Sequence, residues 1–184
     1  MTVDGALVDG GIARDYPDTG RHRLVAAVDE NVEVRVHVVG EAFCGLGDET
    51  SGHSELDDAI VDFRSNALEL AVIVFKSSGD IEQVAAYDAF LDANKDHWLA
   101  REIRSFWKRV LKRIDVTSRS LVAVIEPGSC FAGTLAEIAL ACDRSYMLIG
   151  QLNGSNQTPA TMMLSGVNFG AYPMPNGISR LESR

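Results

Sequence analysis

Two short apolar runs, separated by a segment with helical periodicity, constrain the fold of this chain more than any other feature. Residues 70–75 (LAVIVF) and 120–125 (SLVAVI) have the length and the almost unbroken apolar character of buried strands. Strands that are joined through a helix pair in parallel, with a right-handed crossover. The sequence therefore predicts an α/β fold in which these two strands are adjacent and parallel.

Local patterns predict the remaining elements. Residues 24–28 and 32–38 are β-branched runs around a polar turn, which predicts a β-hairpin. Ser54 precedes an acidic residue by three positions, as in a capping box, so we expect a helix that begins at Glu55. Further helices are expected at 81–93, 97–114 and 133–142, and short strands at 144–149 and 161–164.

Composition excludes several classes of protein. With 184 residues, 46% of them hydrophobic, the chain is the size of one domain with a full core. A net charge of -9 argues against a nucleic-acid partner, because phosphate binding needs a dense basic face. We see no apolar run long enough for a membrane span and no export leader, so we expect a soluble, cytoplasmic protein without a membrane partner. Residues 1–20 are rich in Gly and Asp and are expected to form a flexible arm before a domain at 21–184.

The segment 120–143 has the arrangement best suited to chemistry: a buried strand, a loop of small residues and a helix. The first N–H groups of such a helix have no partner within it, and the helix dipole favours negative charge there. Glu137 lies about one turn into the helix, where its carboxylate would face the same cavity and act as an acid or base. The alternative is that Glu137 is a solvated helix residue and that the segment is only framework.

The string Glu-Ile-Ala-Leu-Ala-Cys-Asp at 137–143, after a loop of small residues, resembles the signature of the crotonase superfamily of enoyl-CoA hydratases and isomerases. Longer strings resemble the C-terminal half of the benzoyl-CoA-dihydrodiol lyase family of aromatic catabolism. These strings lie at 55–60, 95–98, 113–121, 125–134, 167–170 and 172–173. The resemblance implies a crotonase-like spiral of ββα units, truncated at its C-terminus, that holds an acyl-CoA thioester.

The same resemblance assigns roles to individual residues. Glu137 falls where the family keeps a catalytic acid or base. Backbone N–H groups of two loops fall where the family binds the thioester oxygen. These oxyanion donors are expected at Gly133, Thr134, Leu135, Ser78 and Gly79. Coenzyme A would enter as part of the substrate, with no other cofactor and no metal.

Three departures from the family pattern leave the activity open. A second catalytic Glu of the family is replaced by Gly166, and the side chain of Leu135 is expected to crowd the thioester. The C-terminal helices that complete the acyl pocket and pack oligomers are missing after Arg184. The chain is therefore either a lyase- or hydratase-type enzyme or a decayed half-domain with a structural or oligomerisation role. In both cases we expect a homo-oligomer or a partner subunit.

Simpler roles are expected for the other candidate residues. Asp96 beside His97 favours an N-cap over a catalytic pair, and Cys130 favours a packed thiol over a reactive one. The basic residues of the helix at 97–114 favour a solvated face over a binding patch. The stretch 42–48 echoes a crotonase oxyanion loop, but it lies too early in the chain and is read as coincidence.

Overall fold

The structure is a computed structural model, and it describes residues 23–27, 33–37, 51–66, 71–150, 154 and 156–184. The elements, in chain order, are β1 (Arg23–Ala27), β2 (Glu33–His37), α1 (Ser51–Ser65), β3 (Val72–Ser77), α2 (Ile81–Ala93), α3 (Trp98–Asp115), β4 (Ser120–Ile125), α4 (Gly133–Ala141), β5 (Arg144–Met147) and the short 3-10 helix η2 (Gly166–Phe169). The predicted flexible arm and the stretch 42–48 lie outside the described residues.

The strands form one sheet in the order β1-β2-β3-β4-β5. β1 and β2 pair antiparallel, as the predicted hairpin requires, and every other neighbouring pair is parallel. Val72 of β3 lies opposite Ser120 of β4, which confirms that the two apolar runs are adjacent and parallel. The predicted α/β class is therefore confirmed.

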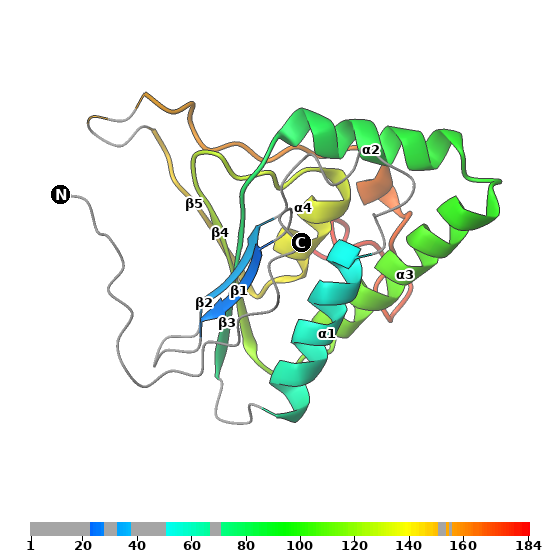
Figure 1. Ribbon diagram of the computed structural model, residues 1–184, viewed down its shortest axis with the longest axis horizontal. Coiled ribbons are helices and arrows are strands. Elements are labelled where there is room, and N and C mark those ends of the chain that lie inside the picture. The colour runs from blue at the N-terminus through cyan, green and yellow to red at the C-terminus, as the bar shows by residue number, and fades with distance from the viewer. Residues whose placement is uncertain (1–22, 28–32, 38–50, 67–70, 151–153, 155) are drawn as a thin grey trace.

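The described helices cover one face of this sheet, to the right of the strands in Figure 1. Side chains along β3 and β4 alternate between buried and partly exposed, because only one face meets the helices. The inner face carries Ile73 and Phe75 from β3, and Leu121 and Ala123 from β4. Both strands carry apolar side chains on both faces of the sheet. Among the described residues, the structure buries only the face that meets the helices.

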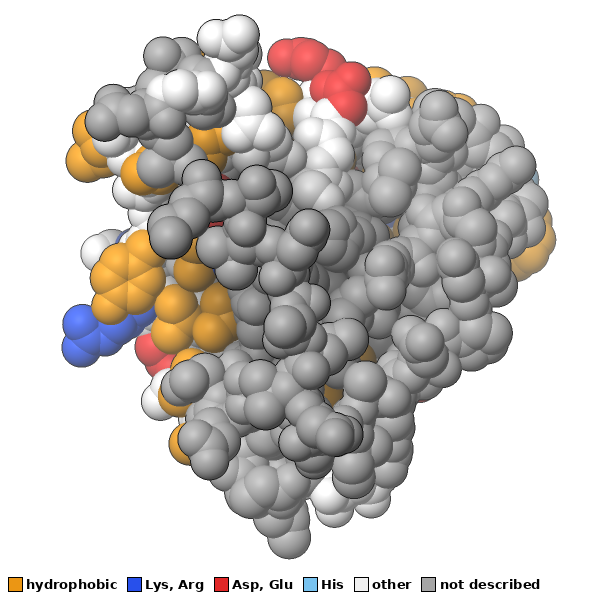
Figure 2. All heavy atoms as spheres, turned by 60° about the vertical axis from the view of Figure 1, so that its left-hand side comes forward, with side chains coloured by type: hydrophobic (Ala, Val, Ile, Leu, Met, Phe, Trp, Pro, Cys, Tyr) orange, Lys and Arg blue, Asp and Glu red, His pale blue; other side chains and the backbone are white. Residues whose placement is uncertain are grey.

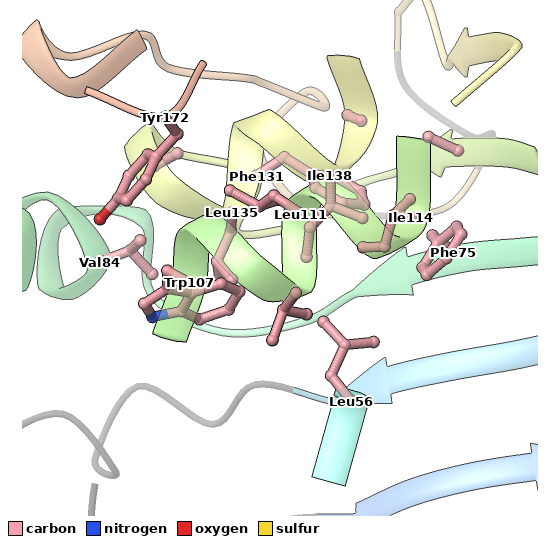
Figure 3. Packing of buried hydrophobic residues seen from close by; sticks show 14 of the residues in the cluster. Leu56, Phe75, Val84, Trp107, Leu111, Ile114, Phe131, Leu135, Ile138 and Tyr172 are labelled. Atoms are coloured by element: carbon pink, nitrogen blue, oxygen red, sulfur yellow. The ribbon is translucent and has the colours of Figure 1, made fainter. Parts of the chain in front are cut away.

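The core forms between the sheet and the helices, where α4 packs against β4 and α3 packs against α1 and α4. Apolar residues of α3 recur at spacings of three and four, and the structure buries that stripe. Figure 3 shows Trp107 and Leu111 of α3 beside Leu135 of α4, with Tyr172 from the C-terminal segment above them. This packing fixes the position of the N-terminal end of α4, where the candidate site lies.

Several element boundaries differ from those predicted. Helix α1 begins at Ser51, one turn before the expected start at Glu55. The N-cap of α3 is His97, whose Nδ1 accepts from the N–H of Leu99 at 3.3 Å, so the N-cap assignment of Asp96 is wrong. The expected strand at 161–164 is reduced to a single bridge between Ala132 and Met163, because the chain turns into α4 at the next residue. None of the described helices combines the length and apolarity needed to cross a bilayer.

Candidate functional site

The loop between β4 and α4 is fixed by hydrogen bonds to the end of β3. The N–H of Cys130 donates to Ser77 Oγ at 3.1 Å, and both residues are buried. Burial raises the pKa of the Cys130 thiol, which disfavours the reactive thiolate. The structure thus supports the prediction of a packed thiol. The hydrogen bond to Ser77 also fixes the loop that leads into the start of α4.

The first three N–H groups of α4, predicted as thioester donors, are all engaged inside the protein. The pairs are Gly133 with the Met163 carbonyl (3.0 Å), Thr134 with Asp88 Oδ2 (2.7 Å) and Leu135 with the Ala132 carbonyl (2.8 Å). A thioester oxygen would have to replace one of these acceptors. The role of these donors stays a prediction.

The second predicted donor loop follows β3. Here the N–H of Gly79 donates to the carbonyl of Gly128 at 3.1 Å, which joins the loops after β3 and β4. Ser78 is partly buried and Gly79 is exposed. The structure therefore places these residues beside the loop that leads into α4, and their N–H role is likewise a prediction.

Glu137 is buried in an ion-pair network, with 1% of its surface exposed. Its Oε1 accepts from Asn168 Nδ2 at 2.7 Å, and its Oε2 accepts from a guanidinium nitrogen of Arg180 at 2.8 Å. The same guanidinium binds both carboxylate oxygens of Asp115, at 2.7 and 2.8 Å, and donates to the Tyr172 carbonyl. Glu137 is therefore not the solvated residue of the alternative reading. Both its oxygens already have charged or polar partners.

Asp88 of α2 completes the site, and the sequence analysis missed it. The residue is 2% exposed, and its two oxygens accept from the backbone N–H of Thr134 at 2.7 Å and from the Thr134 hydroxyl at 2.5 Å. Burial raises the pKa of Asp88 to about 6, although the hydrogen bonds from Thr134 act in the opposite direction. The signal was present in the pattern, since Asp88 lies four residues after Val84 on the buried face of α2.

A hydrogen-bonded chain continues from Asp88 through Thr134. The Thr134 hydroxyl lies 3.2 Å from the hydroxyl of Tyr172, so Tyr172 can donate to Thr134 while Thr134 donates to Asp88. Burial raises the pKa of Tyr172 to about 12, which keeps this phenol protonated. The chain links α2, α4 and the C-terminal segment in one buried polar cluster.

The close approach of Asp88 explains the glycine at the start of α4. A Cβ on Gly133 would lie 1.8 Å from Asp88 Oδ2, and its φ of +41° is a conformation that side chains rarely adopt. No residue with a side chain fits there without moving Asp88.

The structure also describes three further residues that the resemblance singled out. Leu135 is buried and points toward Trp107 in Figure 3, and the expected crowding of a thioester by its side chain stays a prediction. Asp143, the last residue of the signature, accepts from the N–H of Leu121 at 2.7 Å and so ties the end of α4 to the start of β4.

Gly166, at the position of the family's second Glu, is exposed at the start of η2, and a Cβ there would meet no atom within 4 Å. Among the described residues, no group of His, Cys, Asp or Glu side chains could hold a metal ion.

Comparison with known proteins gives one strong match. No family model matches the chain. Solved structures that resemble it include enoyl-CoA hydratases of Geobacillus kaustophilus HTA426 (18% identity, TM-score 0.47, 69% of this chain and 46% of that one) and, as a putative enzyme, of Streptomyces coelicolor A3(2) (17% identity, TM-score 0.44, 76% and 50%).

The strong match is in sequence, to the benzoyl-CoA-dihydrodiol lyase of Aromatoleum evansii. It is 51% identical over 130 residues, which are 71% of this chain and 22% of the lyase, so the chain spans about a fifth of the length of that relative. Identity at this level over a segment of domain size confirms the resemblance that the motifs predicted, and the chain is a relative of benzoyl-CoA-dihydrodiol lyase.

Proposed function

We propose that this chain handles a CoA thioester, as a domain related to part of a benzoyl-CoA-dihydrodiol lyase, and that it binds the acyl-CoA but does not turn it over efficiently by itself. The observation that carries this proposal is the 51% identity to the lyase over 130 residues. The name of that relative specifies a dihydrodiol of benzoyl-CoA, which is a CoA thioester, as its substrate. The thioester oxygen is proposed to bind at the N-terminal end of α4.

The contacts of Glu137 support the second part of the proposal. An acid or base in catalysis must reach the proton that it transfers, at hydrogen-bond distance. Glu137 instead contacts Asn168 and Arg180, and proton transfer would require this buried ion pair to break. Gly166 supplies no carboxylate at the position of the family's second Glu. Both observations argue against rapid hydration or cleavage by this chain on its own.

The experiment is a calorimetric titration with benzoyl-CoA and with crotonyl-CoA, paired with a hydratase assay of the same preparation. We expect saturable binding of at least one ester and little or no turnover. Losing one positioned acid or base typically costs about 10²- to 10⁴-fold in rate, while binding depends on other contacts. Gly166→Glu should then raise any residual rate, since an added side chain has free space there. Rapid turnover by the wild type would contradict the proposal.

A second candidate function is a structural or oligomerisation module without any ligand. It is favoured by a specific observation: the N–H groups of Gly133, Thr134 and Leu135 already have acceptors inside the protein. A packed interior has this property, because buried polar groups are hydrogen-bonded. The absence of binding to any CoA ester in the titration would select this candidate.

A further inference from the structure

The buried carboxylates around α4 differ in whether a cation contacts them. Three buried carboxylates lie on three different helices, Asp88 on α2, Asp115 on α3 and Glu137 on α4. The guanidinium of Arg180 contacts Asp115 and Glu137 at 2.7 and 2.8 Å. Asp88 receives hydrogen bonds from Thr134 alone, and in the described part of the chain no cation is in contact with it. Among the residues that the structure describes, Asp88 is therefore the one carboxyl of the three without a direct counter-ion.

The groups that face Asp88 from the packed elements define its charge balance. Glu137 of α4 disfavours a negative charge on Asp88, while Arg104 of α3 favours it. The guanidinium of Arg104 is, however, already engaged with Asp92 at 3.2 Å. The buried hydroxyl of Tyr172 adds no charge, because its pKa is raised to about 12. A buried carboxylate with this balance gains a proton more readily than one with a guanidinium partner.

We propose that Asp88, rather than Glu137, is the carboxyl group of this site that takes up and releases a proton, with the Thr134 hydroxyl as its hydrogen-bond partner. The proposal rests on the proposed function for its substrate. Asp88 accepts from the N–H of Thr134, one of the donors predicted to bind the thioester oxygen, so it lies next to that oxygen's expected position. On an acyl group that carries protons on the carbon α to its thioester, which a benzoyl group does not, Asp88 as a base would remove one of these protons, which leaves an enolate and a protonated Asp88. The reverse step returns the proton to carbon.

The first test observes the carboxyl group directly. The protein is labelled with ¹³C at the Asp carboxyl carbon, and its spectrum is followed by NMR between pH 4 and 8. One resonance should titrate with a midpoint of about 6 and be missing in Asp88→Asn. Thr134→Val removes a hydrogen bond that favours the ionised form, so it should move this midpoint upward. Asp96→Asn, an exposed change in the turn before α3, should leave the midpoint unchanged. A carboxyl that remains ionised down to pH 4, or a midpoint near 6 that persists in Asp88→Asn, would overturn the proposal.

The second test separates this proposal from the proposed function. Butyryl-CoA, which carries protons α to its thioester, is incubated with the protein in D₂O and its deuterium content is measured. Exchange in the wild type should fall by about 10²-fold or more in Asp88→Asn and persist in Asp96→Asn. Exchange that is unaffected by Asp88→Asn would overturn the role of Asp88 while the proposed function stands. A titrating Asp88 without binding or exchange of any CoA ester would instead overturn the proposed function.

Discussion

Two buried carboxyl groups, Asp88 on α2 and Glu137 on α4, show how contacts decide the chemistry of a residue. Glu137 was singled out by a motif, but its oxygens contact Asn168 and Arg180. Asp88 belongs to no motif, yet of these two carboxyl groups it is the one that no cation contacts among the described residues. The sequence predicted that the start of α4 is chemically distinctive. It did not predict the contact with Arg180, which lies 43 positions after Glu137. That segment is rich in Gly and Pro and has no hydrophobic periodicity that would indicate a buried side chain.

Asp88 should give the stability of the fold a defined pH dependence. Burial raises its pKa from 3.8 to about 6, so the folded state holds a proton that the unfolded state has lost between about pH 4 and 6. This contribution is fully present below pH 4 and is lost as the pH rises through 6. The difference of about two pH units corresponds to about 3 kcal/mol.

The matched variant is Asp88→Asn, which resembles the protonated side chain. Its free energy of unfolding, from urea titration, should equal that of the wild type near pH 4 and exceed it at pH 8. The result expected if Asp88 were an ordinary carboxylate is a constant difference between the two proteins at both pH values.

Arg180 should be among the residues on which stability depends most. It is 1% exposed and contacts two buried carboxylates. Removal of one partner from a buried ion pair costs about 3–5 kcal/mol, because it leaves unpaired charge in the interior. Arg180→Met should lower the free energy of unfolding by about this amount.

Arg184→Met is the control for this variant, since that side chain donates to the carbonyls of Leu140 and Cys142 near the surface and binds no carboxylate among the described residues. Its effect should stay below about 1 kcal/mol. Equal effects of the two variants would show that Arg180 does not stabilise the fold through its carboxylates.

At the scale of elements, the start of α4 requires a glycine for two separable reasons. Gly133 and Gly177 both have positive φ, but a Cβ on Gly177 would meet no atom within 4 Å, whereas one on Gly133 would collide with Asp88. Alanine at either position strains the backbone, because both have positive φ, and only Gly133→Ala adds a steric clash. Gly133→Ala should therefore destabilise the protein by at least about 2 kcal/mol more than Gly177→Ala. Thermal and urea unfolding of both variants measure the difference. Similar losses would mean that α2 and α4 move apart at little cost.

The elements that local patterns define were predicted well. The hairpin of β1 and β2, the parallel pair β3 and β4, and helices α2 to α4 all follow from periodicity in short windows. The predictions that failed concern segments whose structure depends on contacts with residues distant in the sequence. The apolar run at 161–164 makes one bridge instead of a strand, while at η2 the Ser165 N–H donates to Asn168 Oδ1 at 2.8 Å.

At the scale of the whole molecule, the sheet has an unevenly covered surface. Tyr146 and Met147 of the edge strand β5 are 56% and 46% exposed, and Ile149 after it is 96% exposed. Figure 2 shows hydrophobic side chains gathered on this side of the molecule. Exposed apolar patches favour association, so we predict that the chain self-associates at micromolar concentration.

Analytical ultracentrifugation tests this prediction. The wild type should sediment as a dimer or larger species, and Tyr146→Arg should shift the distribution toward monomer. A matched change elsewhere on the surface, Lys108→Glu on α3, should have no such effect. A wild type that sediments as a clean monomer would contradict the prediction.

The central claim is that a CoA thioester is handled at the N-terminal end of α4, and the most direct measurement is the ¹H–¹⁵N NMR spectrum of the protein during a titration with benzoyl-CoA. A thioester oxygen that binds there through the Thr134 N–H must replace Asp88 as the acceptor of that N–H. We expect a saturable shift of the amide resonances of Thr134 and Leu135 with benzoyl-CoA, and a much weaker one with free CoA. Saturable binding that leaves these amides unmoved, or no binding at all, would contradict it.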